Sequence, residues 1–255
     1  MSGTRHSFMI AAAQIASVRG DVAANVAQHA AAISAAAAAG VSVVVFPELS
    51  LTGYEPDMSA SLAFTDDDAR LEPLRRLVVD HHLTTMIGAP IRTEDKPAIG
   101  AFILGPDGAR RVYRKMHLGS SEIPFFSPGT EPVVLEVGAY RIGASICADS
   151  SQHSHAETYY GLGARIYAAG VFLTDAWYVT DAPRLQAFAA DFGMLTVMAN
   201  QADSIGTYRS VGRSTVWSPG GSLLVQAEGA EEALIIAKDK NGAWDGHTLG
   251  IEALT

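Results

Sequence analysis

Residues 7–46, SFMIAAAQIASVRGDVAANVAQHAAAISAAAAAGVSVVVF, place an alanine-rich segment between two short apolar ones. The first apolar segment, at 7–15, and the last, at 41–46, predict buried β-strands, the last because it is rich in β-branched valine. The middle segment predicts a helix that starts after Asp21, a favourable N-cap residue, and stops at Gly40. A strand, a helix and a second strand in this order indicate an α/β protein.

The rest of the chain continues this alternation and adds strands that are joined by short turns. Helices are predicted at 64–82, broken near Pro73, and at 181–193, and a loose tail follows the last strand, at 232–238. Because hairpins and helical crossovers both occur, we expect mixed sheets. No linker, charge block or repeat divides the chain, so we expect one domain over residues 1–255, with two sheets and helices covering their outer faces. Further strands are predicted at 84–91, 98–105, 110–114, 131–137, 140–146, 165–173 and 195–200, with a hairpin at 212–227.

The composition is that of a compact protein and excludes several classes of partner. Hydrophobic residues make up 48% and charged residues 18% of the 255 residues, and the formal net charge is −9. The acidic balance argues against nucleic-acid binding, which needs basic patches. The single cysteine excludes an intramolecular disulfide and a cysteine-rich zinc site. The N-terminal apolar run is too short to span a membrane, so we expect a cytoplasmic enzyme or binding protein.

Three polar residues with different chemistry follow apolar or β-prone segments. Glu48 follows VVVFP, Lys115 follows RRVYR, and Cys147 follows RIGASI. Strand ends hold side chains rigidly, so a carboxylate, an ammonium group and a thiol at such ends match a base, a cation and a nucleophile. Each residue alone is explained more simply, as a surface carboxylate, a solvated lysine or a buried thiol. Their spacing does not decide between these interpretations.

The sequence around the three residues is more specific. The segments FPELSLTGYEP at 46–56, YRKMHL at 113–118 and ICAD at 146–149 closely resemble the three signature segments of the nitrilase superfamily of carbon–nitrogen hydrolases. Because these segments occur in the family's order and the likeness covers nearly the whole chain, the protein is identified as a member of this superfamily. The likeness also includes AAAQIAS at 11–17, EIPFFSPGTEP at 122–132 and VGRSTVWSPGGSLL at 211–224.

The resemblance implies a four-layer α-β-β-α sandwich, with two mixed sheets inside and helices on the outer faces. It also implies that Glu48 is the general base, Lys115 the oxyanion-stabilising cation and Cys147 the nucleophile. Glu122 matches a second glutamate that positions the lysine and the substrate in many members. The backbone N–H of Ala148 is expected to bind the oxyanion together with Lys115. No glycine-rich phosphate loop lies between a strand and a helix, so we expect no cofactor.

The chain departs from the family pattern directly after the nucleophile. Relatives have an aromatic residue, an acid and then Phe-Pro-Glu, whereas this chain has Ala148 and Asp149 and no Phe-Pro-Glu. Ala148 is expected to leave more room beside Cys147 unless another side chain fills the space. Asp149 is expected to bond backbone near the nucleophile turn. Relatives usually build their dimer interface in this region, so the homodimer that the resemblance implies is less firmly indicated here.

Several further residues have a functional and a simpler interpretation. Tyr54, Phe125 and Trp177 are candidates for lining the substrate pocket, with simple packing as the alternative. The segment HSHAE at 153–157 has two histidines and a glutamate at metal-like spacing. Alternate histidines share one face only on a strand, and this segment is expected to begin a helix, so solvated or capping roles are favoured. We therefore expect no metal site.

The favoured activity is that of an amidase, which converts a small linear amide to a carboxylic acid and ammonia through a thioester on Cys147. An N-carbamoyl amine hydrolase or a nitrilase is the alternative, because the chemistry is shared up to the first intermediate. A catalytically silent relative that binds a metabolite is a third hypothesis. The loss of the aromatic residue at Ala148 supports this third hypothesis, and the retained glutamate, lysine and cysteine oppose it.

Overall fold

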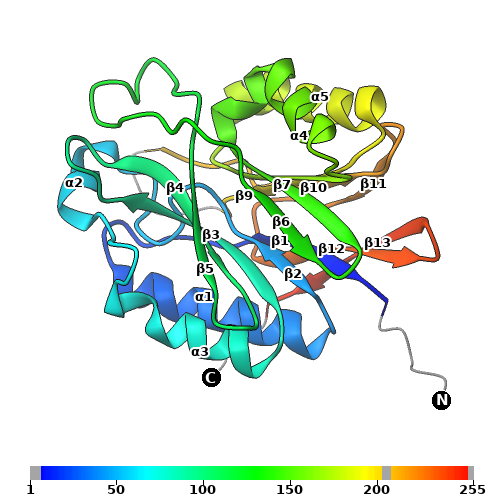
Figure 1. The fold of residues 1–255 in the computed structure, drawn as a ribbon, viewed down its shortest axis with the longest axis horizontal. Coiled ribbons are helices and arrows are strands. Elements are labelled where there is room, and N and C mark those ends of the chain that lie inside the picture. The colour runs from blue at the N-terminus through cyan, green and yellow to red at the C-terminus, as the bar shows by residue number, and fades with distance from the viewer. Residues whose placement is uncertain (1–6, 203–207, 252–255) are drawn as a thin grey trace.

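The computed structural model describes residues 7–202 and 208–251, which form two mixed β-sheets (Figure 1). The seven-stranded sheet has the order β13-β12-β1-β2-β3-β4-β5, and the six-stranded sheet the order β11-β10-β9-β8-β7-β6. The first sheet contains β1 (Met9–Gln14), β2 (Val43–Val45), β3 (Thr84–Ile91), β4 (Ala98–Leu104), β5 (Arg110–Arg114), β12 (Ala233–Lys240) and β13 (Ala243–Gly250). The second contains β6 (Val134–Val137), β7 (Tyr140–Ile146), β8 (Ile166–Val171), β9 (Leu195–Asn200), β10 (Thr215–Trp217) and β11 (Leu223–Gln226).

Helices cover the outer faces of both sheets (Figure 1). α1 (Val22–Ala38) and α3 (Glu72–Asp80) share an apolar cluster with the seven-stranded sheet. α4 (His153–Gly161) and α5 (Asp175–Phe192) share another with the six-stranded sheet. The layers therefore run helix, sheet, sheet, helix, and the expected four-layer α-β-β-α sandwich is confirmed. The short elements are α2 (Ser59–Leu62) and the 3₁₀ turns Pro56–Met58, Ala69–Leu71 and Cys147–Ser151.

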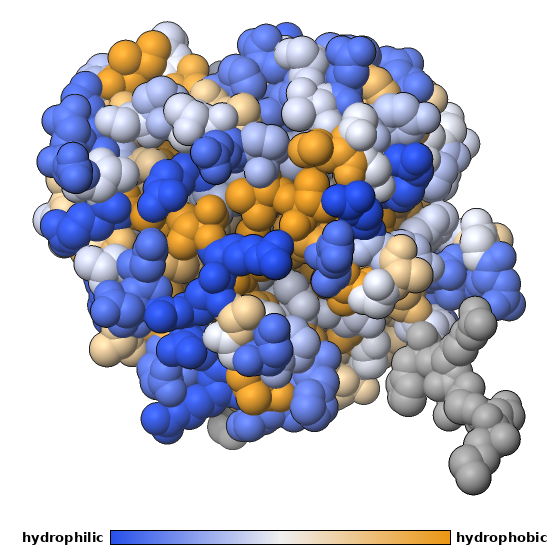
Figure 2. All heavy atoms as spheres, viewed as in Figure 1, coloured by the Kyte–Doolittle hydropathy of each residue, from blue (hydrophilic) through white to orange (hydrophobic). Residues whose placement is uncertain are grey.

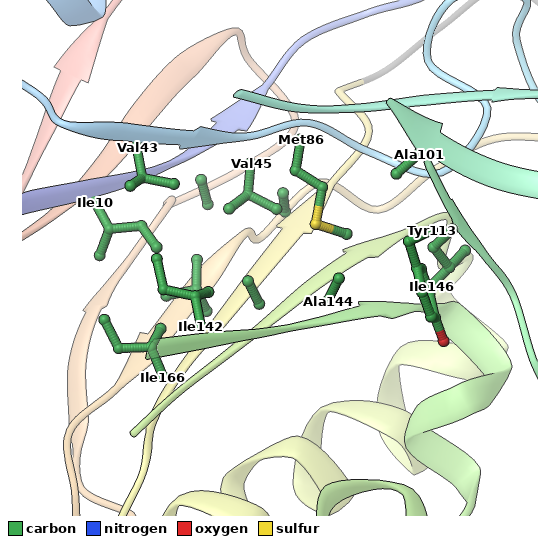
Figure 3. Close-up of a cluster of buried hydrophobic side chains, with 14 of the residues drawn as sticks. Ile10, Val43, Val45, Met86, Ala101, Tyr113, Ile142, Ala144, Ile146 and Ile166 are labelled. Carbon is green, nitrogen blue, oxygen red and sulfur yellow. The ribbon is translucent and has the colours of Figure 1, made fainter. Parts of the chain in front are cut away.

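The short strand β2 explains how the layers are held together. Its side chains alternate between the two faces of the sheet, so Val43 and Val45 enter the core between the sheets, while Val44 packs against the helical layer. Figure 3 shows Val43 and Val45 facing Ile142 and Ala144 of β7 across the space between the sheets. Since both sheets contribute to this one core, we propose that they form the single domain expected from the sequence.

The helix predicted between the first two strands is confirmed with its boundaries. The side chain of Asp21 accepts a hydrogen bond of 3.0 Å from the N–H of Ala24, as an N-cap residue does. α1 ends at Ala38, and Gly40 adopts a left-handed φ of 77°, a conformation that glycine reaches without steric cost. The parallel pairing of β1 with β2 completes the predicted strand–helix–strand unit.

Three predicted boundaries were wrong. Pro73 does not break a helix but lies in the first turn of α3, where its missing N–H has no intrahelical partner to lose. α5 begins at Asp175, ahead of the predicted start at 181, and continues through Pro183. The segment after Lys240 is not a loose tail, because β13 pairs antiparallel with β12 along its whole length.

The surface of the face drawn in Figure 2 differs between its middle and its margins. Apolar side chains gather along the middle of this face, and polar side chains cover most of the rest. A cleft of about 310 Å³ lies between strands of the two sheets, and its apolar wall includes Ile103 of β4 and Leu135 and Val137 of β6. Among the described residues, no helix has the length and apolar character needed to cross a membrane.

Candidate active site

Glu48 is placed by a tight turn that follows β2. Two glycines on neighbouring strands leave room for this turn: a Cβ at Gly88 of β3 would lie 2.1 Å from the carbonyl oxygen of Pro47, and one at Gly170 of β8 would lie 2.4 Å from that of Phe46. Any larger residue at either position would therefore force the turn to move. The turn is thus wedged between the two sheets, and the Glu48 side chain is buried.

Lys115 follows β5 and extends toward Glu48. Its Nζ donates to Glu48 Oε1 at 2.6 Å and to Glu122 Oε1 and Oε2 at 2.7 and 2.9 Å. The side chains of Lys115 and Glu48 are 0% exposed and that of Glu122 is 3% exposed. One ammonium group is therefore held between two buried carboxylates, in a geometry that removes its rotational freedom.

Glu122 is held by groups from two other segments besides Lys115. Its Oε1 accepts a hydrogen bond of 2.9 Å from the hydroxyl of Tyr54, and its Oε2 accepts one of 2.7 Å from the N–H of Gly119. The Tyr54 ring stacks on Phe172 with ring centroids 4.8 Å apart, and it makes a T-shaped contact with Tyr208 at 6.1 Å. Tyr54 therefore both packs in an aromatic wall and fixes Glu122.

Cys147 lies where β7 ends and a 3₁₀ turn begins. Its φ is 41°, a left-handed value that costs a non-glycine residue energy and that is maintained only where surrounding contacts enforce it. The thiol lies 4.0 Å from the carbonyl oxygen of Phe172. Glu48, Lys115 and Glu122 all act electrostatically on this thiol. The three candidate residues from three separate segments thus lie together in the structure.

The electrostatics of the cluster are set by burial and by one excess negative charge. Burial raises the pKa of Glu48 to about 7, because Lys115 opposes the shift only in part and Glu122 adds to it. Burial alone would lower the pKa of Lys115, but the attraction of Glu48 and of the other acidic groups raises it, so the lysine stays charged. Burial, with repulsion from Glu48, raises the pKa of the Cys147 thiol well above its usual range despite Lys115. The Cys147 thiol is therefore protonated in the resting protein at neutral pH.

Asp149 connects the segments that carry Lys115 and Cys147. Its Oδ2 accepts a hydrogen bond of 3.0 Å from the N–H of Ile146, and its Oδ1 accepts bonds of 3.1 and 2.9 Å from the N–H groups of Met116 and His117. Because Ile146 precedes Cys147 and Met116 follows Lys115, one carboxylate fixes the backbone beside both residues. The expected backbone role of Asp149 is confirmed, and it is wider than the nucleophile turn alone.

The remaining candidates lie around this cluster at different depths. Ala148 follows Cys147 in the 3₁₀ turn and is partly exposed. Trp177 lies in the first turn of α5 and is 40% exposed, and no hydrogen bond or ring contact joins it to the charged cluster within the described residues. Phe125 lies in the loop after Glu122 and is also exposed. Phe172 and Tyr208, in contrast, contact Tyr54 and were not predicted from the sequence. Phe172 directly follows β8, where an aromatic residue usually packs in the core, and Tyr208 lies in a loop with no recognisable pattern.

The two histidines of the segment 153–157 point in different directions. His153 is exposed and contacts Asp191 at 3.2 Å, whereas His155 is buried beneath the nucleophile turn. His155, His117 and Asp149 bring three possible metal-ligand atoms within 4.8 Å of one another. The carboxylate oxygens of Asp149 already accept hydrogen bonds from backbone and from Tyr113, so its lone pairs are occupied by protons. The group therefore forms a hydrogen-bonded cluster rather than an open ligand set.

Several curated proteins are similar to this chain in sequence. It is 29% identical over 244 residues to the chloroplastic omega-amidase of Arabidopsis thaliana, a match that covers 87% of this chain and 65% of that protein. It is 27% identical to a nitrilase of Pyrococcus abyssi over 81% of this chain and 79% of that protein. A 31% identical stretch of the glutamine-dependent NAD(+) synthetase of Thermotoga maritima covers 54% of this chain and 25% of the synthetase. The chain thus spans a quarter of the synthetase and about two thirds of the omega-amidase.

Solved structures show the same fold at low sequence identity. An amidase from Nesterenkonia sp. superposes with a TM-score of 0.83 at 25% identity, covering 94% of this chain and 94% of that one. Nit3 of Saccharomyces cerevisiae, a member of the nitrilase superfamily, superposes with a TM-score of 0.84 at 21% identity, covering 91% and 90%. The family model of carbon-nitrogen hydrolase matches residues 9–240. Since this match covers most of the chain and includes every residue of the charged cluster, the chain belongs to the carbon–nitrogen hydrolase family, within the nitrilase superfamily.

Proposed function

We propose that the protein is an amidase that hydrolyses a small linear amide to a carboxylic acid and ammonia, with Cys147 as nucleophile, Glu48 as general base and Lys115 as oxyanion-stabilising cation. The observation that carries this proposal is the burial of the Lys115 ammonium between two carboxylates, with a strained cysteine beside them. A buried charge cluster of this kind costs stability and is retained at functional sites. Membership of the carbon–nitrogen hydrolase family supports the same chemistry.

The first half of the reaction forms a thioester. The Cys147 thiol is protonated at rest, and Glu48, with a pKa of about 7, is a base matched to neutral pH. When the amide carbonyl lies against the sulfur, Glu48 takes the thiol proton and the sulfur bonds to the carbonyl carbon. The carbonyl oxygen becomes an oxyanion that Lys115 and the backbone N–H of Ala148 stabilise. Glu48 then gives the proton to the leaving nitrogen, the C–N bond breaks, and ammonia departs.

The second half of the reaction releases the acid. A water molecule takes the place of ammonia, and Glu48 removes one of its protons as the water oxygen bonds to the thioester carbon. The same oxyanion donors stabilise the second tetrahedral intermediate, and the C–S bond then breaks. The proton returns from Glu48 to the sulfur, which restores the starting state. Glu122 and Tyr54 hold Lys115 in place throughout, and Trp177 and Phe125 are proposed to contact the substrate from the rim of the site.

The charges and the aromatic side chains around the site indicate which acyl groups the substrate can carry. The buried cluster of Glu48, Lys115 and Glu122 carries one excess negative charge, which would repel a carboxylate on the bound substrate. The wall formed by Tyr54, Phe172 and Tyr208 is aromatic. Both features favour an uncharged acyl group over the carboxylate-bearing groups of many carbamoyl substrates. N-carbamoyl amine hydrolysis and nitrile hydrolysis are the alternatives, because they use the same nucleophile, base and cation.

A substrate screen with a matched variant tests the proposal. Short linear amides, N-carbamoyl amines and nitriles are incubated with the protein, and ammonia release is measured. We expect the neutral amides to give the highest kcat/KM, and Cys147→Ala to abolish the release. Release at the wild-type rate by Cys147→Ala would contradict the mechanism. Binding of a metabolite without turnover of any class would favour the catalytically silent alternative.

We also propose that the protein is a cytoplasmic homodimer that pairs through α4 and α5. Several large apolar side chains on or beside these helices are exposed in the single chain, and two-fold pairing would bury them in an isologous contact. These residues are Tyr160, Leu162 and Val179. Light scattering at micromolar concentration is expected to give the mass of two chains. A monomer, or a dimer that a charge at Val179 leaves intact, would contradict this interface.

A further inference from the structure

A chain of buried side chains runs from the interior of β7 to Asp149, and the proposed reaction does not use it directly. The hydroxyl of Tyr113 donates to Asp149 Oδ2 at 2.6 Å and lies 3.0 Å from His155 Nε2. His155 Nδ1 lies 2.8 Å from the hydroxyl of Tyr167, which also lies 2.8 Å from Ser145 Oγ. All five residues are buried. We call this set, Ser145, Tyr167, His155, Tyr113 and Asp149, the His155 relay.

The protonation states along the relay are fixed by burial and by the short bond at its end. Burial raises the pKa of Tyr113 and Tyr167 and lowers that of His155, so the two phenols keep their protons and the imidazole is neutral. Burial would raise the pKa of Asp149, but its hydrogen bonds with His117, Tyr113 and the N–H of Ile146 lower it, so it is ionised. The Tyr113 hydrogen therefore goes to Asp149, and the Tyr167 hydrogen goes to Ser145 Oγ. Both phenol oxygens can then only accept from His155, and the neutral imidazole donates its one hydrogen to Tyr113 when that hydrogen is on Nε2.

The relay ends at the Asp149 carboxylate, which binds the backbone beside both Cys147 and Lys115. Asp149 accepts from the N–H of Ile146, next to Cys147, and from the N–H of Met116, next to Lys115. A shift of Asp149 would therefore move the nucleophile and the cation relative to each other. The segment that follows the nucleophile turn supplies His155. This segment is thus connected to the nucleophile turn by the hydrogen bonds from His155 through Tyr113 to Asp149.

We propose that His155 is a positioning residue for the proposed amide hydrolysis, acting through Tyr113 and Asp149 on the backbone beside Cys147 and Lys115. This inference rests on the proposed function for its kinetic effect, whereas its structural part is independent of any substrate. It requires that breaking the relay lowers kcat more than it changes KM, because the substrate still binds while the reacting groups lose their alignment. A misalignment on the order of 1 Å costs roughly 100-fold in rate.

Four variants test the proposal. Tyr113→Phe and His155→Phe break the relay while keeping ring packing, and His155→Gln keeps an N–H that can donate to Tyr113. Tyr140→Phe is the matched control, because it also deletes one phenol–aspartate hydrogen bond, of 2.7 Å to Asp239, outside the relay. We expect kcat to fall about 10- to 100-fold in the first two variants with KM within about twofold. His155→Gln should retain more kcat than His155→Phe, and Tyr140→Phe should match the wild type.

Amide hydrogen exchange separates this proposal from the proposed function. Exchange at Ile146 and Met116, followed by NMR at pH 7, should accelerate in Tyr113→Phe and His155→Phe but not in Tyr140→Phe. If the ammonia screen finds no substrate, the proposed function fails and the exchange rates still test the relay. Equal kcat in Tyr113→Phe and Tyr140→Phe, unchanged exchange at both amides, or no advantage of His155→Gln over His155→Phe would each overturn the positioning role.

Discussion

The two ends of the sandwich differ in how deeply their charged groups are buried. Where β2 and β7 finish, Lys115 is enclosed between Glu48 and Glu122, and the side chains are at most 3% exposed. At the end where β1 and β2 begin, the hydroxyl of Tyr140 donates to Asp239 at 2.7 Å beside an open cleft of about 670 Å³. The first end buries three formal charges, whereas the second has an open cleft and ordinary hydrogen bonds to one charged group, Asp239.

The state of the polar groups distinguishes the two ends. Glu48 Oε2 has no partner in the described part of the chain that meets hydrogen-bond geometry, although the Cys147 thiol stabilises the carboxylate. Cys147 has a left-handed φ, and Glu48 has a pKa near neutrality. At the other end, both oxygens of Asp239 accept hydrogen bonds, from Tyr140 and from the N–H of Gly242. Strain and unpaired buried groups mark functional sites, and they occur at the first end.

The largest expected difference between the two ends is in turnover. Glu48→Gln keeps the shape of the side chain but cannot accept the thiol proton, so kcat/KM for an amide should fall by about 10²- to 10⁴-fold. Asp239→Asn makes the same kind of change at the opposite end and should leave kcat/KM unchanged. The two variants are compared by ammonia release under identical conditions. Comparable losses in both would show that the variants act through stability and not through a base.

The second-largest expected difference is in the free energy of unfolding after a lysine is removed. Lys115→Met keeps the length of the side chain but leaves Glu48 and Glu122 facing each other without a cation. Breaking a buried ion pair in this way costs about 3–5 kcal/mol of unfolding free energy. The two carboxyls can relieve their repulsion by binding a proton, and the folded pKa of Glu48, already raised by burial, then rises further because the attraction of Lys115 is lost. The folded variant therefore binds more protons than the unfolded chain, and its deficit should grow as the pH rises from about 5 to about 8.

Urea unfolding of wild type and Lys115→Met at these two pH values measures this effect. The matched control is Lys240→Met, which removes an exposed lysine that pairs with Asp245 at 2.6 Å. Exposed pairs contribute about 0–1 kcal/mol, so this variant should be close to wild type at both pH values. A deficit of Lys115→Met that is the same at both pH values would mean that the two carboxylates do not interact as the structure indicates.

The two ends also differ in how much of them could be predicted from the sequence. Glu48, Lys115 and Cys147 could be identified because each follows a strand-like segment within a recognisable motif. His155 could not be assigned a partner, because Tyr113 and Asp149 reach it from a strand and a turn that the fold alone brings together. His155 and the glutamate two residues later resemble surface residues in the sequence, since histidine in a polar segment is usually solvated.

The errors in the fold have similar causes. β13 has an alternating but mostly exposed sequence, and its position depends on backbone pairing with β12, which leaves no apolar signal to recognise. Pro73 suggests a helix break because proline is unfavourable in a helix interior, yet the first turn tolerates it. The β2 strand is predicted correctly because burial on both faces requires an uninterrupted apolar run. Local patterns thus predict strands inside the core better than strands at an edge.

The pH dependence of activity sharpens the contrast between the two ends further. Glu48 must be ionised to accept the thiol proton, and its pKa of about 7 makes the ionised fraction fall as the pH drops below neutrality. We therefore expect kcat/KM to rise with pH and to level off above about 7, with a tenfold loss for each pH unit well below it. The profile is measured with an uncharged amide, so that the substrate does not titrate. A midpoint near 4.5, the ordinary value for a glutamate, would show that burial does not tune this group.

The smallest expected difference compares two tyrosine hydroxyls that each bond one carboxylate. Tyr54→Phe removes the 2.9 Å bond to Glu122, and Tyr140→Phe removes the 2.7 Å bond to Asp239. Each should cost about 0.5–1.5 kcal/mol of unfolding free energy, or somewhat more because the acceptors are charged. Only Tyr54→Phe should also lower kcat, by a few-fold, because Glu122 retains Lys115 and the N–H of Gly119 as partners and Lys115 moves little.

Thermal or urea unfolding and kcat are measured for both variants on the same preparation. A loss of kcat in Tyr140→Phe as large as in Tyr54→Phe would contradict the separation of the two ends. A complete loss in Tyr54→Phe would mean that the hydroxyl itself touches the substrate, because a hydrogen bond that only supports Glu122 has no means of producing so large an effect.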